Sequence, residues 1–459
     1  MKTAGSKERG GHVRYGVLAA MVAALGGYMF GFEMALIAGP LIFIQSYFAL
    51  TSQQVGFLVA SLPIGAILGA ALAGTCSDYW GRRKVLVFSA ILFAVSSLAC
   101  ALPRTVTELM AGRFLAGVGV GAVSILSPMY IAEIAPATIR GRLVVLNQLA
   151  LVIGILCAYI IPYLFSEAGE DNWRYMFAVG LLPSLLFLVA MTGVPESPRW
   201  LANKGRPEEA FAILARIAGE QHARSELTEI ETAIAQEEGA FRELFRPGLR
   251  LAVLIGLVMP FIDQTTGINV IVFYAPTIFQ QAGQSDPIAL LGAVAVGLMN
   301  LVGTIIGMLV IDRLGRKPLA YIGLSGMCLS LILLGFVFQS ENTAGMLIGG
   351  LMVSFIAFYS ISLGCVVLLL AAEIFPNKIR GRAMSVSLVS LWIWCTVVPM
   401  TFPLLSEAIT IARSFWIYAA MCIFAWIFIW QVVPETKDKT LEQIESFWRL
   451  KGRQAKMEA

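Results

Sequence analysis

Long apolar stretches separated by short polar segments make up most of the chain. There are about twelve of them, each close to the ~20 residues that an α-helix needs to cross a bilayer. They run approximately over 14–40, 53–75, 84–103, 108–131, 142–165, 174–194, 250–281, 288–311, 318–339, 344–371, 383–405 and 412–433. The pattern predicts a polytopic, all-α membrane protein.

A concentration of polar groups interrupts the seventh apolar stretch. Residues 263–269 read Asp-Gln-Thr-Thr-Gly-Ile-Asn, with Pro260 and Pro276 on either side. Polar side chains at membrane depth are costly unless they have partners or line a wet cavity. The Gly and Pro residues also predict a locally unwound helix. Two interpretations follow: a ligand-binding site, or a helix-packing seam held by polar contacts.

Composition and charge agree with membrane insertion. The chain is 58% hydrophobic and 14% charged, with a mean hydropathy of +0.79, whereas soluble proteins have about 25% charged residues. Lys and Arg gather in alternate loops, notably 82–84, 199–250, 313–317 and 378–382. By the positive-inside rule, these loops and both termini are predicted to be cytoplasmic, in an inner or plasma membrane. The net charge of +4 therefore reflects orientation and requires no nucleic-acid partner.

The chain repeats itself at an interval of roughly 240 residues. The segment 78–84 resembles 312–318, the segment 133–142 resembles 373–382, and Val-Pro-Glu at 194–196 returns at 433–435. Each copy holds about six apolar stretches, so the copies are predicted to be parallel repeats that bind a substrate between them and transport it by rocking.

The repeats predict the following domain boundaries. They are a cytoplasmic N-terminus at 1–13, an N-terminal six-helix bundle at 14–199, a cytoplasmic helical linker at 200–249, a C-terminal six-helix bundle at 250–434 and a cytoplasmic tail at 435–459. The linker and the tail contain short amphipathic stretches that favour helices. Neither segment is large enough for a catalytic or DNA-binding domain.

The repeated loops combine acidic residues with Arg near the ends of helices. Arg makes bidentate contacts with carboxylates, so these residues can form a network that latches the halves together in one conformation. The alternative is that the basic residues only anchor the topology. This predicted gate network comprises Asp78, Arg82, Arg83, Glu133, Arg140, Arg142, Glu196, Arg199, Asp312, Arg316, Glu373, Arg380, Arg382 and Glu435.

No pattern in the chain indicates an enzyme. The seven Cys residues lie singly in or beside apolar stretches without metal-ligand spacing, so we interpret them as packing residues. His12 and His222 both fall in predicted cytoplasmic segments, which leaves carboxylates for any proton relay across the membrane. No combination of nucleophile and base appears, and no cofactor or metal is expected.

Several longer motifs occur in order along the chain. They are Gly74-x-x-x-Asp78-x-x-Gly81-Arg82-Arg83, Gly112-Arg113-x-x-x-Gly117-x-Gly119-x-Gly121, Pro128-Met129-Tyr130-Ile131-Ala132-Glu133, Pro195-Glu196-Ser197-Pro198-Arg199 and Gln264-x-x-Gly267-x-Asn269. Together they resemble the sugar porter family of the major facilitator superfamily. The resemblance covers nearly the whole chain. It implies twelve transmembrane helices in two pseudo-symmetric six-helix halves, with short cytoplasmic helices between them.

Glu33 and Arg113 lie within apolar stretches, and an acid–base pair is the expected remedy for their burial. By resemblance, Arg113 occupies the place of the Arg in sugar–proton symporters, and Glu33 occupies the place of their Asp. The resemblance implies proton coupling, in which protonation of Glu33 breaks the pair and biases one conformation. The alternative is a static pair that joins two helices.

The resemblance also implies a set of solute-binding residues. They are Gln148, Gln264, Asn269 and Asn300, which supply amides, and Trp392, which supplies an aromatic surface. The chain departs from the family at Asp263, where Gln is usual, and at Cys365 and Leu368, where Pro and Trp are usual. Loss of that Pro is expected to stiffen the tenth helix, and loss of the Trp removes a stacking surface.

Asp263 leaves three interpretations open. As a carboxylate it can accept hydrogen bonds from two hydroxyl groups of a polyol, cyclitol or sugar. It can instead serve as a second proton site, or it can pair with the amino group of a cationic solute or an amino sugar. We include Asp263 among the predicted solute-binding residues.

Together these observations predict a secondary transporter, not an enzyme, that carries a sugar or related polyhydroxylated solute with a proton by alternating access. We expect it to work as a monomer in the bilayer with the proton as its coupling ion. One alternative is an uncoupled sugar facilitator or a carrier of an atypical solute such as a cyclitol or an amino sugar. Another is a transporter-like nutrient sensor, against which the short tail argues.

Overall fold

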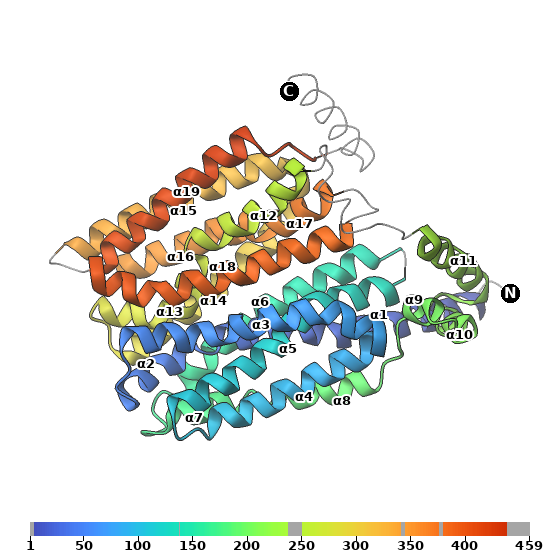
Figure 1. Cartoon of the computed structure of the whole chain (residues 1–459), viewed down its shortest axis with the longest axis horizontal. Coiled ribbons are helices and arrows are strands. Elements are labelled where there is room, and N and C mark those ends of the chain that lie inside the picture. The colour runs from blue at the N-terminus through green and yellow to red at the C-terminus, as the bar shows by residue number, and fades with distance from the viewer. Residues whose placement is uncertain (1–3, 137, 237–249, 341–344, 376–379, 438–459) are drawn as a thin grey trace. The chain divides into compact units, whose positions relative to one another are not determined.

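The computed structural model describes residues 4–136, 138–236, 250–340, 345–375 and 380–437, and these form helices joined by short connections (Figure 1). Within these ranges, only the backbone is described for residues 4–13, 233, 235–236, 368, 372 and 380–382. The predicted amphipathic stretch of the tail lies outside the described residues.

The helices of the first half and of the connecting segment are as follows: α1 (Ala4–Ala35), α2 (Ala38–Tyr47), α3 (Ser52–Trp80), α4 (Arg82–Ala101), α5 (Val106–Ile134), α6 (Arg140–Phe165), α7 (Asn172–Ala178), α8 (Leu181–Thr192), α9 (Pro198–Asn203), α10 (Pro207–Ala218) and α11 (Glu220–Gln236). Those of the second half are α12 (Arg250–Thr265), α13 (Ile268–Gln281), α14 (Asp286–Leu314), α15 (Arg316–Gln339), α16 (Gly345–Ile361), α17 (Leu363–Ile374), α18 (Arg380–Ile409) and α19 (Ile411–Gln431).

Twelve helical segments among the described residues are long and apolar enough to cross a membrane, which agrees with the sequence prediction. Four of them consist of two helices in succession: α1 with α2, α7 with α8, α12 with α13, and α16 with α17. Short helices α9 to α11 connect the sixth and seventh spans, as the linker pattern predicts.

The chain divides into two compact units that do not coincide with the two sequence repeats. The first contains Met1–Met34, Gly65–Ala158 and Arg174–Glu238. The second contains Ala35–Ile64, Tyr159–Trp173 and Gly239–Ala459. Helices α1, α3, α6 and α7 pass from one unit into the other. The predicted domain boundaries therefore stay a prediction, and each unit is described separately below.

In the first unit, α1 and α6 approach each other closely along two glycines. A Cβ at Gly31 would lie 1.9 Å from the backbone oxygen of Leu151, and one at Gly154 would lie 2.2 Å from that of Tyr28. No side chain fits such spaces, so the two helices pack backbone to backbone. This seam fixes the position of α1, which carries Glu33.

In the second unit, segments from both sequence repeats pack together. Helix α2 contacts α13, and the Tyr159 hydroxyl donates a hydrogen bond of 2.7 Å to the backbone oxygen of Val272. Gly56 faces the backbone oxygen of Met400, 2.2 Å from an added Cβ. One end of the second repeat is thus joined to part of the first.

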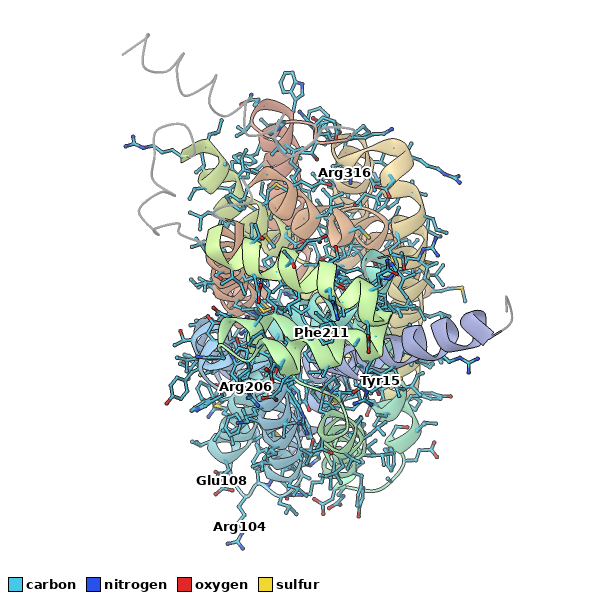
Figure 2. The ribbon with its side chains drawn as sticks, turned by 90° about the vertical axis from the view of Figure 1, so that its right-hand side faces the viewer. Tyr15, Arg104, Glu108, Arg206, Phe211 and Arg316 are labelled. Carbon is cyan, nitrogen blue, oxygen red and sulfur yellow. The ribbon has the colours of Figure 1, made fainter. Side chains whose placement is uncertain are left out.

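The connecting helices pack onto one end of the first unit. Trp200 of α9 donates from its indole nitrogen to the backbone oxygen of Asp78 at 3.0 Å, and Arg140 pairs with Glu226 of α11 at 2.6 Å. Figure 2 shows Tyr15 at this end, near α10 with Phe211. The guanidinium carbon of Arg216 lies 4.3 Å from the centre of the Tyr15 ring.

Candidate functional site

Glu33 and Arg113 form a buried ion pair in the first unit. The Arg113 Nη1 atom lies 3.4 Å from Glu33 Oε2. Arg113 is 1% exposed and Glu33 is 2% exposed. The pair is incompletely satisfied, because Glu33 Oε1 and Arg113 Nε are buried and make no hydrogen bond with the described residues. A pair that only held helices together would gain from satisfying these atoms, since buried charges are costly without full hydrogen bonding.

The polar segment 263–269 forms an interrupted helix in the second unit, as its sequence predicts. Helix α12 ends at Thr265 and α13 begins at Ile268. Gly267 between them has φ 88°, a left-handed conformation that favours glycine. The Thr266 hydroxyl donates to the backbone oxygen of Asp263 at 2.7 Å, which satisfies one carbonyl near the break.

The break brings three predicted residues into one hydrogen-bonded chain. Asn269 donates from Nδ2 to Gln264 Oε1, and Gln264 donates from Nε2 to Asp263 Oδ2 at 2.8 Å. All three side chains are buried, Asp263 at 5% exposure. The other carboxyl oxygen, Asp263 Oδ1, is buried and accepts no hydrogen bond from the part of the chain that the structure describes.

Two further residues that lie beside these three hydrogen-bonded side chains were not identified from the sequence. The Tyr359 phenol of α16 lies close enough to interact electrostatically with the Asp263 carboxyl group, and Cys395 Sγ of α18 lies 3.2 Å from Asn269 Nδ2. A signal for Tyr359 exists, since residues 359–362 read Tyr-Ser-Ile-Ser within an apolar stretch. We name Asp263, Gln264, Asn269, Tyr359 and Cys395 the Asp263 cluster.

The remaining predicted solute-binding residues lie in both units. Asn300 of α14 is buried and accepts a hydrogen bond of 2.7 Å from the Ser360 hydroxyl through its Oδ1. Trp392 of α18 is 1% exposed. Both belong to the second unit, whereas half-buried Gln148 of α6 belongs to the first. Their binding role stays a prediction.

The tenth span is interrupted even though it lacks the family's proline. Helix α16 ends at Ile361 and α17 begins at Leu363. The Ser362 hydroxyl donates to the backbone oxygen of Phe358 at 2.6 Å, a contact that often bends helices. Gly323 of α15 leaves room for Ser362, whose hydroxyl would lie 1.6 Å from a Cβ there. The tenth span is thus interrupted without the proline, and the expected effect on its stiffness stays a prediction.

Acidic and basic residues of the predicted gate network are connected within the first unit. Arg82 pairs with Asp78 at 2.9 Å and with Glu133 at 3.3 Å, and the Ser197 hydroxyl donates to Glu133 Oε2 at 2.5 Å. Glu196 Oε1 accepts from the backbone N–H groups of Arg83 at 3.0 Å and Ser197 at 2.9 Å.

The same arrangement recurs in the second unit. Arg316 pairs with Asp312 at 3.3 Å and with Glu373 at 2.7 Å, and the Thr436 hydroxyl donates to Glu373 Oε2 at 2.6 Å. Glu435 accepts from four backbone N–H groups, those of residues 316, 317, 436 and 437. Each set of contacts is complete within one half, and a latch between the halves stays a prediction.

The other predicted members of the gate network have different surroundings. Arg140 pairs with Glu226, Arg142 is exposed, and Arg199 acts electrostatically on Glu133. The side chains of Arg380 and Arg382 lie outside the described residues.

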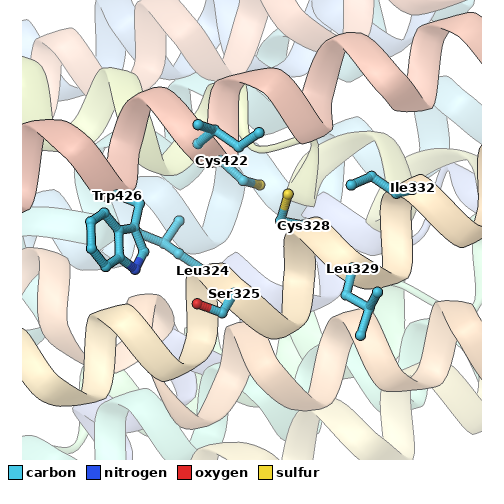
Figure 3. Close-up of a pocket in the computed structure, with 8 residues that line it drawn as sticks. Leu324, Ser325, Cys328, Leu329, Ile332, Cys422 and Trp426 are labelled. Carbon is cyan, nitrogen blue, oxygen red and sulfur yellow. The ribbon is translucent and has the colours of Figure 1, made fainter.

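A pocket of about 340 Å³ opens between α15 and α19 in the second unit. Its walls are mostly apolar, with the thiols of Cys328 and Cys422 turned toward its centre and Trp426 at one side (Figure 3). Leu329 and Ile423 on its rim are at least half exposed. A polyhydroxylated solute needs several polar partners, so this pocket does not fit one.

Three comparisons with known proteins agree with one another. The sequence profile of the family described as "Sugar (and other) transporter" matches residues 19–448. An arabinose–proton symporter of Bacillus subtilis is 37% identical, covering 94% of this chain and 95% of its own. A D-xylose–proton symporter of Escherichia coli is 38% identical, covering 93% and 94%. The inward-open structure of the E. coli xylose transporter XylE matches with a TM-score of 0.83 at 36% identity, covering 94% of this chain and 99% of that one.

Proposed function

Because the chain belongs to the sugar transporter family, a family of transporters and not of enzymes, we propose that it carries a sugar or related polyhydroxylated solute together with a proton. Transport proceeds by alternating access between two conformations. The arabinose–proton and D-xylose–proton symporters that it resembles support this activity.

One observation carries the proton coupling: the incompletely satisfied Glu33–Arg113 pair. Protonation of Glu33 removes its charge and releases Arg113 to other partners. A conformation that keeps the pair is therefore favoured when Glu33 is ionised, and one that separates it is favoured when Glu33 is protonated. An uncoupled facilitator has no need of a buried, titratable carboxyl group opposite this Arg.

The solute is bound by amide groups and an aromatic surface. In this proposal Gln148, Gln264, Asn269 and Asn300 donate and accept hydrogen bonds with solute hydroxyls, and Trp392 packs against an apolar face of the solute. The buried Asp263–Gln264–Asn269 chain supports this role, because buried polar groups on an interrupted membrane helix are typical of transport sites.

The protein lies in the cell membrane with both termini in the cytoplasm, since the basic loops then face inward. The helices α9 to α11 are cytoplasmic in this orientation, and the active form is the monomer. Light scattering on the detergent-solubilised protein, and protease access to the termini in oriented vesicles, test these two points.

The experiment that tests the function is uptake of labelled L-arabinose, D-xylose and myo-inositol into proteoliposomes. Wild-type protein should accumulate at least one solute against its gradient when the outside is acidic, and a protonophore should abolish the accumulation. Glu33→Gln should keep solute exchange but lose accumulation, whereas Glu33→Asp should retain part of it. Accumulation that ignores the protonophore would rule out proton symport.

A further inference from the structure

We propose that the Asp263 cluster binds a protonated amino group, so that the solute is an amine-bearing polyhydroxylated compound such as an amino sugar or an aminocyclitol. This inference deepens the proposed function and rests on it for the polyhydroxylated part of the solute. The neutral amides of the cluster bind the hydroxyls, and the Asp263 carboxylate binds the ammonium group.

The first argument is the direction of the hydrogen-bonded chain. A carboxylate only accepts, so Gln264 must turn its NH₂ group toward Asp263 Oδ2 and its oxygen toward Asn269 Nδ2. Both bonds then point their donors toward Asp263. The network therefore stabilises negative charge on this side chain, and Oδ1 makes no close hydrogen bond with the described residues.

The second argument is the lack of a compensating charge. Asp263 is 5% exposed, and none of the salt bridges among the described residues involves it. Its neighbours in the cluster are a phenol, a thiol and two amides, all neutral donors or acceptors. A buried carboxylate without a cation is costly, so a cation from outside the protein completes the site.

An ammonium group fits better than the two other candidate cations. A metal ion takes several oxygen ligands, whereas the cluster offers one carboxyl group. A proton on the carboxyl group would remove the charge, but it would also weaken the acceptor toward which the Gln264 amide and the Tyr359 phenol are directed. An ammonium group supplies both a positive charge and a donor, and Tyr359 beside the carboxyl group adds a polar partner and a ring face.

The position of Asp263 beside Gln264 also favours a group of the solute as the cation. Asp263 is adjacent in sequence to Gln264 and is joined to it by a hydrogen bond, so a solute held by Gln264 and Asn269 brings its neighbouring substituent to Oδ1. A carboxamide in place of the Asp263 carboxylate would have the same shape but no charge. The variant Asp263→Asn therefore isolates the charge.

The test measures binding to the purified full-length protein as a shift in thermal unfolding and as solute counterflow in proteoliposomes, neither of which needs a proton gradient. The probes are D-glucosamine, D-galactosamine and 2-deoxystreptamine, with D-glucose, D-galactose and N-acetyl-D-glucosamine as uncharged counterparts. At least one amine should bind ten-fold or more tightly than its uncharged counterpart. Asp263→Asn should reduce that preference to less than two-fold.

Two controls separate the explanations. Asp286→Asn and Glu407→Gln each remove an exposed carboxylate, at the start of α14 and near the end of α18, and both should keep the amine preference. Absence of binding for all three amines, or an unchanged preference in Asp263→Asn, overturns the inference. Fewer protons carried per neutral solute in Asp263→Asn also overturns it, because Asp263 would then be a proton carrier.

The outcomes distinguish this inference from the proposed function. A protein that binds the amines but accumulates no solute under a proton gradient contradicts the symport and leaves the inference standing. A protein that accumulates neutral sugars under the gradient but ignores the amines contradicts only the inference.

Discussion

A single carboxylate organises the chain at the end of the second half. Glu435 accepts hydrogen bonds from the backbone N–H groups of Arg316, Lys317, Thr436 and Lys437. Partial burial raises the pKa of this carboxyl group, but the four backbone hydrogen bonds outweigh that effect and lower the pKa below its ordinary value of 4.5. The ionised form is therefore the one that the folded protein prefers.

This preference predicts a pH-dependent stability difference between wild type and Glu435→Gln. Because the folded-state pKa is depressed, the contribution of Glu435 is fully present above pH 4.5 and is lost as the pH falls through the lower folded-state value. Thermal unfolding in detergent should show the variant less stable by about 1 kcal/mol at neutral pH. The difference should vanish once the pH falls below the depressed folded-state pKa of Glu435. A difference that grows toward low pH would contradict this account.

Other single residues show which contacts could be predicted from the sequence and which could not. The pairing of Glu33 with Arg113 could be predicted, because charged residues within apolar stretches need partners. The structure places the two side chains in contact. The polar run that contains Tyr359 is visible in the sequence, but its contact with Asp263 could not be predicted, because that contact depends on how the tenth span lies beside the seventh. Contacts between distant helices are set by packing, which a pattern along one chain does not contain.

At the scale of helices, the two interruptions show the same contrast. The break between α12 and α13 was predictable, because Gly267 and the flanking prolines are local signals. The break between α16 and α17 was not, because it depends on Ser362 bonding to Phe358 and on the space that Gly323 of α15 leaves for it. Local chemistry is visible in sequence, whereas a bend made possible by a neighbouring helix is not.

The seam between α1 and α6 makes a prediction at this scale. Gly154→Ala should destabilise the protein by about 1–3 kcal/mol, because the new Cβ meets the Tyr28 backbone 2.2 Å away and the helices must separate. Gly74→Ala, at an exposed position of α3 where nothing lies within 4 Å of the new Cβ, should instead stabilise its helix by about 0.5–1 kcal/mol. Thermal unfolding of both variants in detergent measures the difference. Equal effects would show that the two helices separate freely.

At the scale of the molecule, the twelve spans were predictable because bilayer thickness fixes the length of an apolar helix. The internal repeat predicted more, since equivalent motifs fold into equivalent contacts. Arg82, Glu133 and Glu196 of the first half correspond in their bonding to Arg316, Glu373 and Glu435 of the second. The division into compact units was not predictable, because it depends on α2 packing against α13.

The self-contained bonding of each half has a consequence for how the protein can be assembled. A chain cut between residues 237 and 249 keeps the Glu133–Glu196 contacts in one fragment and the Glu373–Glu435 contacts in the other. Each fragment then keeps its own set of ion pairs and hydrogen bonds. The packing of α2 against α13 joins the two fragments. Two separately encoded fragments, co-expressed in one cell with an affinity tag on one only, should therefore co-purify and restore solute exchange. Failure to co-purify would show that the covalent link itself is required.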